Sequence, residues 1–454
     1  MTLAATIRSN PHWLPENDPN ILADVPGEDG WPIVGTTVRM LSDPPAFVQR
    51  MHDRYGNVYR SKNFGGRLVT LLGAEANEFV LFDRERIFSS EQGWGTVLNL
   101  VFPRGLMLMD FDHHRADRRI LSAAFKPEAM RSYCEGLNRV IATRAGEWRG
   151  GPVQLYPAVK TLTLDLAATC FLGIPFGPEC DRINKAFIDM VAAAVAVVRV
   201  PLPGTAMGRG VAGRSYLSRH FRDAIPERRA NDGQDIFSQI CRATDEEGQP
   251  LDDGQIIDHI NFLMMAAHDT TTSTIAYMAM MLARHRDWQD KLREEMLGLG
   301  LGSGPLPYER IGDLVLTEYA MKESLRLMPP VPSIPRRALK PFSFGGYDFP
   351  AGTFIGLQPG FTHRMPEYWP SPNRFDPMRF TPEKVRERHK YAWVPFGGGA
   401  HMCLGLHFAY MQAKIFFYHL LVNGQLTLVR DSRRWHTWPI PRPRDTLVVR
   451  YDPL

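Results

Sequence analysis

The chain has 454 residues, long enough for a large buried interior, and 44% of them are hydrophobic and 22% charged. With a mean hydropathy of -0.24, this is the composition of an ordinary soluble globular protein. The formal net charge of +4 is small for this length. It argues against a dedicated nucleic-acid binder, because the basic face of such a protein usually dominates the total charge.

Cysteine usage indicates a reducing compartment. The cysteines are sparse, odd in number and never spaced as CxxC, so they do not form the pattern of a disulfide framework. They are Cys134, Cys170, Cys180, Cys241 and Cys403. We therefore expect a cytoplasmic protein, and the absence of a CxxCH motif argues against covalently attached haem.

The sequence also predicts that there is no membrane anchor. Residues 1–20 lack the basic-then-apolar order of a signal peptide. A spanning helix needs about 20 apolar residues, but the best candidate, residues 190–198, is interrupted at Arg199 and stopped at Pro201. We expect a soluble chain.

Taken in chain order, the segments predict a mainly α (α+β) fold. Residues 1 to about 45 are rich in proline, glycine and acidic residues, which is typical of an irregular lead-in. A β-rich part is expected over about 46–112 and a helical core over about 113–340, followed by loops and strands over about 341–454. Because no long polar linker separates these parts, we expect one domain over residues 1–454.

The longest predicted helix runs from about Asp253 to Arg284. Asp252 or Asp253 can cap its N-terminus, and apolar residues surround its axis, which is typical of a buried helix. Its middle, residues 266–274, contains one carboxylate and five hydroxyls. Because Thr and Ser hydroxyls compete for backbone carbonyls, we expect a local break filled by water, of the kind that occurs at functional sites.

A glycine-rich loop, residues 395–405, carries Cys403 just before a helix-like stretch over 407–421. Glycines allow the backbone to approach a flat ligand closely. A thiolate at the start of a helix is stabilised by the helix dipole and by nearby amide donors. Taken alone, a single cysteine in such a loop is more often a small buried residue than a ligand.

The other residues of the loop favour a role for Cys403 as a ligand. Phe396, Gly399, His401, Cys403 and Gly405 match the pattern FxxGx(H/R)xCxG, which resembles the haem loop of the cytochrome P450 family. The resemblance implies haem b, with Cys403 as the iron ligand. It extends over nearly the whole chain and implies the cytochrome P450 fold, in which a long central helix lies over the haem and the N- and C-terminal segments form a small β-rich part.

A second match is the ExxR pair Glu323 and Arg326, which the i, i+3 spacing places on one helix face. In the family this pair is structural, and an arginine that resembles Arg379 joins it. A carboxylate held between two guanidiniums would fix the layer beneath the haem. Without the other motifs, Glu323 and Arg326 would be interpreted as an ordinary surface ion pair.

A third match lies in the middle of the long helix. Residues 266–270, which include Ala266, Asp269 and Thr270, are similar to the family's (A/G)Gx(D/E)T oxygen-activation box. The resemblance implies that the Thr270 hydroxyl bonds the bound oxygen and that Asp269 relays protons. Ala267 departs from the pattern, where glycine is usual, and we interpret His268 as structural. The alternative is a satisfied polar pair in the core.

A fourth set resembles the residues that bind the haem propionates in this family. It consists of His114, Arg118, Arg336 and His401. Buried carboxylates require cationic or hydrogen-bonding partners. For His114 and Arg118, four residues apart on a predicted helix, the alternative is a solvated helix face.

By resemblance, the substrate cavity is lined by several apolar segments, and a lipophilic substrate is expected. These segments are residues 94–109, 191–207, 262–266, 331–334 and 437–440. The stretch Pro201–Thr205 resembles weakly the branch of the family that oxidises sterols, retinoids and terpenoids.

Electrons must come from another protein, because no flavin-binding or iron–sulfur domain is appended. The basic residues Arg115, Arg118, Arg119, Lys126 and Arg131 outnumber Asp117 and Glu128 on the helices expected to face away from the substrate. An acidic ferredoxin, supplied by its reductase, could be steered to such a surface. An ordinary charged surface helix is an equal alternative.

The sequence thus favours a haem-thiolate monooxygenase that inserts one oxygen atom from O2 into a lipophilic molecule. One alternative is a haem-thiolate enzyme that uses peroxide or rearranges its substrate. Another is a haem-based sensor or binding protein. The Asp269–Thr270 pair argues against both, because neither needs a proton relay.

Overall fold

The computed structural model describes residues 13–14, 22–175, 177–196, 199–245 and 247–454. Most of the N-terminal segment examined for a signal peptide therefore lies outside the described residues, as does the end of the apolar stretch at residues 197–198. Within the part of the chain that is described, no helix has both the length and the apolar character needed to cross a bilayer.

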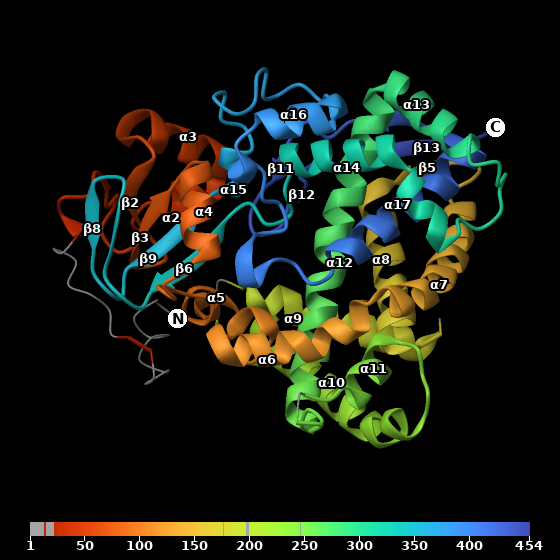
Figure 1. Cartoon of the computed structure of the whole chain (residues 1–454), viewed down its shortest axis with the longest axis horizontal. Coiled ribbons are helices and arrows are strands. Elements are labelled where there is room, and N and C mark those ends of the chain that lie inside the picture. Colours follow the sequence, from red (N-terminus) through yellow and green to blue (C-terminus); the bar gives the residue numbers. More distant parts are fainter. Residues whose placement is uncertain (1–12, 15–21, 176, 197–198, 246) are drawn as a thin grey trace.

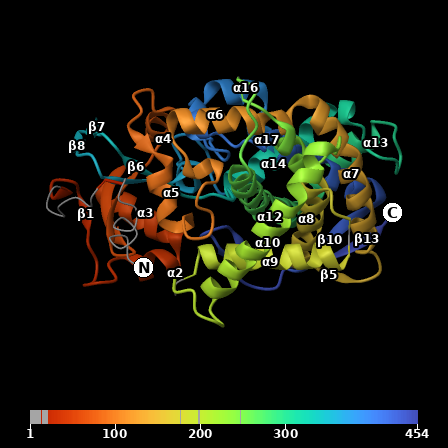
Figure 2. The same cartoon turned by 90° about the horizontal axis from the view of Figure 1, so that it is seen from below.

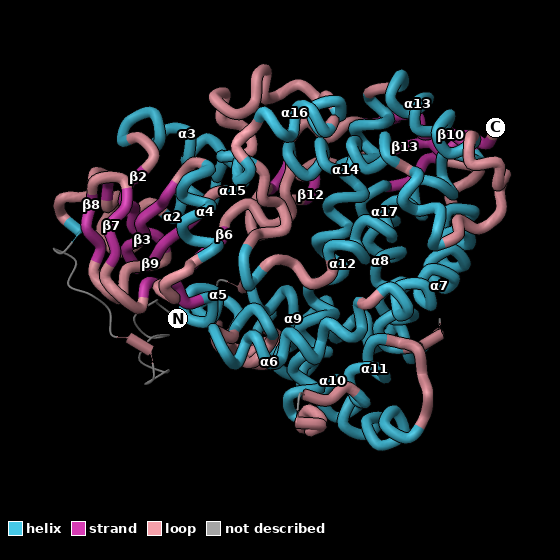
Figure 3. Tube along the Cα trace, viewed as in Figure 1, coloured by secondary structure: helices cyan, strands magenta, loops and turns pink. Residues whose placement is uncertain are grey.

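The molecule has a large helical part and a smaller part built on a sheet (Figures 1 and 3). The first helices lie beside the sheet, and the helices from α6 onward form most of the other part. The helices are α2 (Thr37–Ser42), α3 (Pro44–Tyr55), α4 (Ala74–Phe82), α5 (Ser90–Leu98), α6 (Phe111–Ser122), α7 (Pro127–Gly146), α8 (Leu155–Leu172), α9 (Pro178–Ala194), α10 (Ala206–Ala230), α11 (Ile236–Arg242), α12 (Asp253–Arg284), α13 (Arg286–Leu297), α14 (Val315–Leu327), α15 (Pro359–Thr362), α16 (Pro382–Glu387) and α17 (Leu406–Asn423).

The larger sheet joins segments far apart in the sequence. Its order is β1-β2-β3-β9-β6-β4, and the pairing of β3 with β9 is parallel, with Val69 opposite Ile355. Its strands are β1 (Gly27–Glu28), β2 (Val58–Asn63), β3 (Gly66–Leu71), β4 (Phe88–Ser89), β6 (Ile334–Ala338) and β9 (Phe354–Leu357). The small β-rich part beside a helical body confirms the predicted mainly α (α+β) class.

A second sheet brings the C-terminal strands against the helical part, in the order β10-β13-β5. Two further pairs of short strands, β7-β8 and β11-β12, complete the β structure of the described residues. These strands are β5 (Pro152–Gln154), β7 (Phe342–Phe344), β8 (Tyr347–Phe349), β10 (Gly424–Arg430), β11 (Trp435–His436), β12 (Arg442–Pro443) and β13 (Val448–Pro453).

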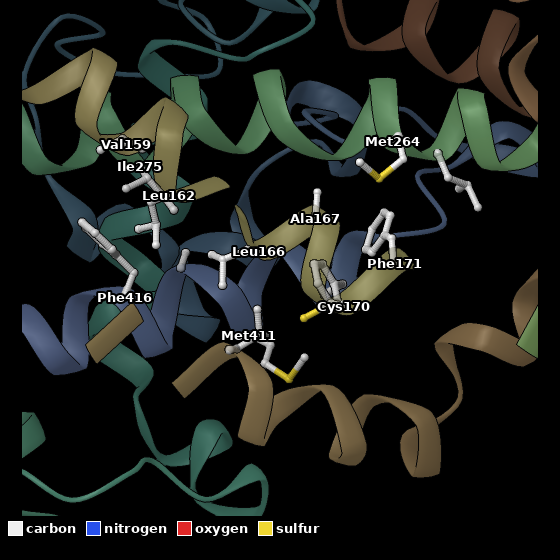
Figure 4. Packing of buried hydrophobic residues seen from close by; sticks show 14 of the residues in the cluster. Val159, Leu162, Leu166, Ala167, Cys170, Phe171, Met264, Ile275, Met411 and Phe416 are labelled. Atoms are coloured by element: carbon white, nitrogen blue, oxygen red, sulfur yellow. The ribbon is translucent and has the colours of Figure 1, made fainter. Parts of the chain in front are cut away.

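Helix α12 occupies the middle of the helical part, and Figure 2 looks down its axis. It begins and ends at the predicted residues, and Asp252 and Gln255 form a capping box at its N-terminus. Helix α8 packs along it, α7 packs against α8, and α17 contacts both α7 and α12. Figure 4 shows buried side chains of this region. The buried side chains between these helices include Val159, Leu162, Leu166, Ala167, Cys170, Phe171, Met264, Ile275, Met411 and Phe416.

The local break expected in the middle of this helix is not present, because α12 is continuous from Asp253 to Arg284. The hydroxyls of Thr270, Thr272 and Thr274 each donate to the carbonyl four residues earlier, at 2.7–2.9 Å. These hydroxyls add bonds to carbonyls of the helix without displacing the backbone ladder. The prediction of a break was wrong for this reason.

The expected segment boundaries also require correction. The segment 1–45, expected to be irregular, contains β1 and α2, and the β-rich segment 46–112 contains three helices. Strand β6 falls in the expected helical core. These short elements depend on tertiary partners: β1 exists because Gly27 and Glu28 pair with Arg60 and Ser61 of β2. Their local sequences carry little periodicity from which to predict them.

Candidate active site

The loop before α17 holds Cys403 at the wall of a large cavity. The backbone N–H of Cys403 donates to the Phe396 carbonyl at 2.9 Å, and α17 begins three residues later. Gly399 has φ +60°, and a Cβ atom there would lie 2.0 Å from the Leu81 carbonyl oxygen of α4. This glycine is therefore required by the close approach of the loop to α4 as well as by its backbone conformation.

The Cys403 thiol is open to the cavity. The protein that surrounds it raises the pKa of the thiol, while the Gly405 N–H and the Arg118 guanidinium lower it. The backbone donor and the cation both stabilise a thiolate, which is the form that binds iron. The loop therefore presents a sulfur that a metal cation in the cavity would convert to its anionic form.

Four cationic or hydrogen-bonding side chains meet beside the cysteine, as the sequence predicted. The rings of His114 on α6 and His401 in the loop have centroids 3.9 Å apart. Burial lowers the pKa of His114 to about 4, with contributions from Arg118 and Arg336. Burial also lowers the pKa of His401 to about 2, with contributions from Arg336, His114 and Arg118. The cluster therefore carries positive charge at a site that is largely shielded from water.

These residues fit the two propionates of a haem. Arg336 is almost completely buried, yet neither it nor Arg118 forms an ion pair with a carboxylate among the described residues. Burial lowers the pKa of Arg336 to about 10. A buried guanidinium without a directly paired carboxylate is costly, and two anionic groups placed here would pair with Arg336 and the partly buried Arg118. The donor set of Cys403 and this cluster therefore matches a haem.

The opposite wall of the cavity is the middle of α12. Met265, Ala266, Ala267 and Thr270 are partly open there, although most of the surrounding helix is buried. The Thr270 hydroxyl donates to the Ala266 carbonyl at 2.8 Å. It can turn toward a ligand in the cavity only by giving up that bond.

Asp269 also lines this wall and has a partner that the sequence did not reveal. The Nζ of Lys160 on α8 lies 3.0 Å from its Oδ1. Lys160 lies 109 residues earlier in the chain and belongs to no motif. The tertiary packing of α8 against α12 alone brings the two together.

Beneath the cavity, Glu323 and Arg326 form the expected pair on α14. Arg326 donates to both carboxylate oxygens of Glu323 at 2.7 and 2.8 Å, and both side chains are fully buried. The Nε of Arg379 lies 3.5 Å from Glu323 Oε1. Arg326 also donates to the carbonyls of His363, Pro372 and Arg374. The three side chains therefore tie α14 to the segment that precedes the cysteine loop.

The cavity has a volume of about 1680 Å³ and receives side chains from each segment that the sequence indicated. Small-molecule sites typically measure about 300–1,000 Å³, so this cavity has room for a cofactor and a substrate together. Sequence reasoning missed Tyr156 and Lys160 of α8, which also line it.

The basic surface expected on α6 and α7 is smaller than its sequence suggests. Arg118 lines the cavity, and Asp117 is buried with its Oδ2 2.8 Å from the Nε2 of His259 on α12. Arg131 pairs with Glu309 at 2.7 Å. Arg115 and Lys126 remain exposed. Arg118 and Asp117 therefore turn toward the cavity and toward α12, and they do not contribute to a basic surface on α6.

The cytochrome P450 family model matches residues 25–439. The chain belongs to the cytochrome P450 family. It is 36% identical to cytochrome P450 136 of Mycobacterium tuberculosis, covering 94% of this chain and 88% of that protein. It is 30% identical to cytochrome P450 120 of Synechocystis, covering 96% and 98%. The solved structure titled "Retinoic acid bound cyanobacterial CYP120A1" aligns with a TM-score of 0.86, at 30% identity, over 95% of this chain and 99% of that one.

More distant relatives have names that state a reaction. The beta-amyrin 6-beta-monooxygenase of Solanum lycopersicum is 27% identical to this chain, covering 94% of it and 92% of the relative. The present chain is accordingly a cytochrome P450 monooxygenase, an oxidoreductase that requires haem, dioxygen and an electron donor.

Proposed function

We propose that this P450 inserts one oxygen atom from O2 into a lipophilic small molecule, with haem b held by Cys403. The observation that supports this most is the arrangement of one cavity. A thiol, a cluster of unpaired cations and the Ala266–Thr270 segment of α12 all line it. The haem would supply dioxygen binding and oxygen–oxygen bond cleavage, which a thiolate ligand favours.

Each group of residues has a distinct part in this proposal. His114, Arg118, Arg336 and His401 would orient the cofactor through its propionates. Asp269 would pass protons from the solvent side into the cavity, and Thr270 would hold a proton donor or dioxygen by its hydroxyl. Glu323, Arg326 and Arg379 would keep the underlying layer rigid, because a buried carboxylate between guanidiniums has few alternative positions.

The substrate class proposed is a terpenoid, a steroid or a similar molecule. Apolar side chains dominate the cavity lining, with Phe262, Met265 and Val331 among them. The relatives support this choice, since one acts by name on beta-amyrin and a matching structure has retinoic acid bound. Such molecules are held by shape and apolar contact, with few polar anchors.

For the electron donor we propose an acidic ferredoxin-type protein that a reductase recharges. Arg115 of α6 and Lys126, the residue just before α7, are exposed, and Met402 beside the cysteine is also exposed. Opposite charge would speed the encounter and make it sensitive to salt. The five cysteines are all free, which supports the cytoplasm as the proposed compartment.

The carbon monoxide spectrum of the reduced protein tests the ligand. A thiolate-ligated haem gives a strongly red-shifted band, and a histidine-ligated sensor does not. Cys403→Ser is expected to abolish that band. A variant that keeps an identical spectrum would refute the proposal.

Dioxygen chemistry requires a second test. With a lipophilic substrate that shifts the haem absorption, Thr270→Ala is expected to divert electrons from product to peroxide or water. Unchanged coupling between electron consumption and product would favour an enzyme that uses peroxide or rearranges its substrate.

A further inference from the structure

Three ionisable side chains meet where α8 crosses the middle of α12. The Oδ1 of Asp269 lies 3.0 Å from Nζ of Lys160 and 3.4 Å from Nε2 of His268. The Lys160 side chain is 30% exposed, the Asp269 side chain 9% and the His268 side chain 0%. Lys160 and Asp269 both line the cavity. The cluster therefore connects a partly solvated cation to a buried carboxyl group and a fully buried imidazole.

The tautomer of His268 follows from its other nitrogen. Nδ1 lies 2.9 Å from the Met264 carbonyl oxygen, which can only accept a hydrogen bond, so Nδ1 carries the proton. Burial lowers the pKa of His268, which keeps the ring neutral near pH 7. Nε2 then presents a lone pair toward Asp269, and this buried nitrogen has no hydrogen-bond partner.

The carboxyl group consequently faces two partners that favour opposite protonation states. An ionised carboxylate attracts the Lys160 cation but gains nothing from the lone pair of Nε2. A protonated carboxyl can donate its O–H to Nε2 after a small rotation. The rotation shortens the distance between Oδ1 and Nε2 from 3.4 Å to that of a hydrogen bond. The protonated carboxyl gains less from Lys160 than the carboxylate does, because its neutral carbonyl oxygen is a weaker acceptor for the Lys160 N–H groups.

We propose that Lys160 and His268 are positioning residues for proton delivery, and that Asp269 turns to Lys160 when ionised and to His268 when protonated. This inference rests on the proposed function and concerns how the relay is controlled. In each cycle the protonated carboxyl leaves His268 and gives its proton to a water in the cavity, so that its O–H bond breaks as an O–H bond to that water forms. The ionised carboxyl then takes a proton from hydronium in the solvent on the Lys160 side. No electrons move in this step.

One more ionisable group, Tyr156, faces the cluster, and Arg442 acts on Tyr156. Tyr156 of α8 lies one turn before Lys160 and lines the same cavity, and burial followed by the charge of Asp269 raises its pKa. Arg442 of β12 acts on Tyr156 in the opposite direction. Tyr156 stays neutral near pH 7, so Lys160 supplies the charge that holds the ionised state.

Infrared spectroscopy of the resting, haem-loaded protein tests the proposal without turnover. The protonated carboxyl band of Asp269 is assigned by its loss in Asp269→Asn and is followed against pH. Lys160→Met removes the cation, so the pH at which half of this band remains should rise by about one unit or more. Lys160→Arg should keep the wild-type midpoint, since it keeps the charge.

His268→Phe is expected to shift the same midpoint downward, because the protonated carboxyl loses its acceptor. General loosening of the site would not readily shift the midpoint upward in Lys160→Met and downward in His268→Phe. Lys185→Met is the matched control: it removes a lysine 2.7 Å from Asp189 on α9, away from the cavity, and should leave the midpoint unchanged. An unchanged or lowered midpoint in Lys160→Met would overturn the proposal, even where the fully buried His268→Phe fails to fold.

The pH dependence of electron-driven O2 consumption gives a second readout. Its alkaline limit should move with the infrared midpoint in each variant. A failure of the proposed function would abolish O2 consumption and leave the infrared shifts intact. A failure of the present inference would leave the midpoints fixed while O2 is still consumed.

Discussion

The rings of His114 and His401 lie with their centroids 3.9 Å apart, although 287 residues separate them in the chain. One ring comes from α6 and the other from the loop of Cys403. Arg118 and Arg336 act on both rings, and each lowers their pKa. This meeting of cations from different parts of the chain is the feature that most directly specifies an anionic cofactor.

Removing one of these cations should weaken haem retention. A hydrogen bond to a charged group contributes about 1.5–3 kcal/mol, so Arg336→Gln is expected to speed haem loss roughly 10- to 100-fold. Transfer of haem to apomyoglobin measures this rate. Arg115→Gln, which changes an exposed arginine of α6, should leave the rate unchanged. Equal rates in both variants would contradict the assignment.

Loss of the buried carboxylate should destabilise the whole fold. Glu323→Ala leaves Arg326 and Arg379 buried without their counter-charge, which costs about 3–5 kcal/mol. Urea denaturation gives the free energy of unfolding. Glu383→Gln breaks an exposed pair with Arg386 on α16, and its expected cost is below about 1 kcal/mol. Similar costs for the two changes would show that the ExxR layer is dispensable for stability.

Two glycines of the cysteine loop should respond differently to alanine. At Gly399 the added Cβ would lie 2.0 Å from the Leu81 carbonyl oxygen, whereas at Gly397 its nearest neighbour is 3.7 Å away. Both have positive φ. Gly397→Ala should therefore cost about 1–2 kcal/mol from backbone conformation alone. Gly399→Ala should cost about 2–4 kcal/mol and displace the loop.

The carbon monoxide band reports the position of the loop. It is expected to persist in Gly397→Ala and to weaken in Gly399→Ala. Equal unfolding free energies and spectra would mean that α4 does not constrain the loop.

Acid should destabilise the protein through buried neutral histidines. The Nε2 of His363 accepts the backbone N–H of Val394 at 2.9 Å, so protonation there breaks a hydrogen bond. Burial lowers the pKa of His363 to about 3, with a smaller contribution from Arg326. The unfolded chain has a histidine pKa of about 6.5 and binds the proton first.

The free energy of unfolding therefore decreases as the pH falls. The folded state binds fewer protons, so stability is complete above about pH 6.5 and falls as the pH decreases toward about 3, by at most about 1.4 kcal/mol per pH unit for this residue. His363→Gln can still accept the Val394 N–H through its amide oxygen but does not titrate. Its unfolding free energy, followed in urea from pH 7 to 5, should therefore fall less steeply than that of the wild type. Parallel curves would contradict this account.

The sequence by itself determined the features encoded within single elements. The string from Phe396 to Gly405 carried the resemblance to the P450 family, and the bounds of α12 were predicted correctly because its caps and apolar pattern are local. The ExxR spacing likewise fixed the contact of Glu323 with Arg326, since residues three apart share a helix face.

Only the tertiary structure decided which charges meet across elements. Asp117, predicted to lie on a basic surface helix, turns inward to His259, and Asp269 finds Lys160 on another helix. The angle and register at which α6, α8 and α12 pack set these pairs, and no spacing along the chain encodes them. The unbroken middle of α12 has both a local and a tertiary cause, because the Thr270 and Thr274 hydroxyls bond to carbonyls of their own helix and α8 packs against it.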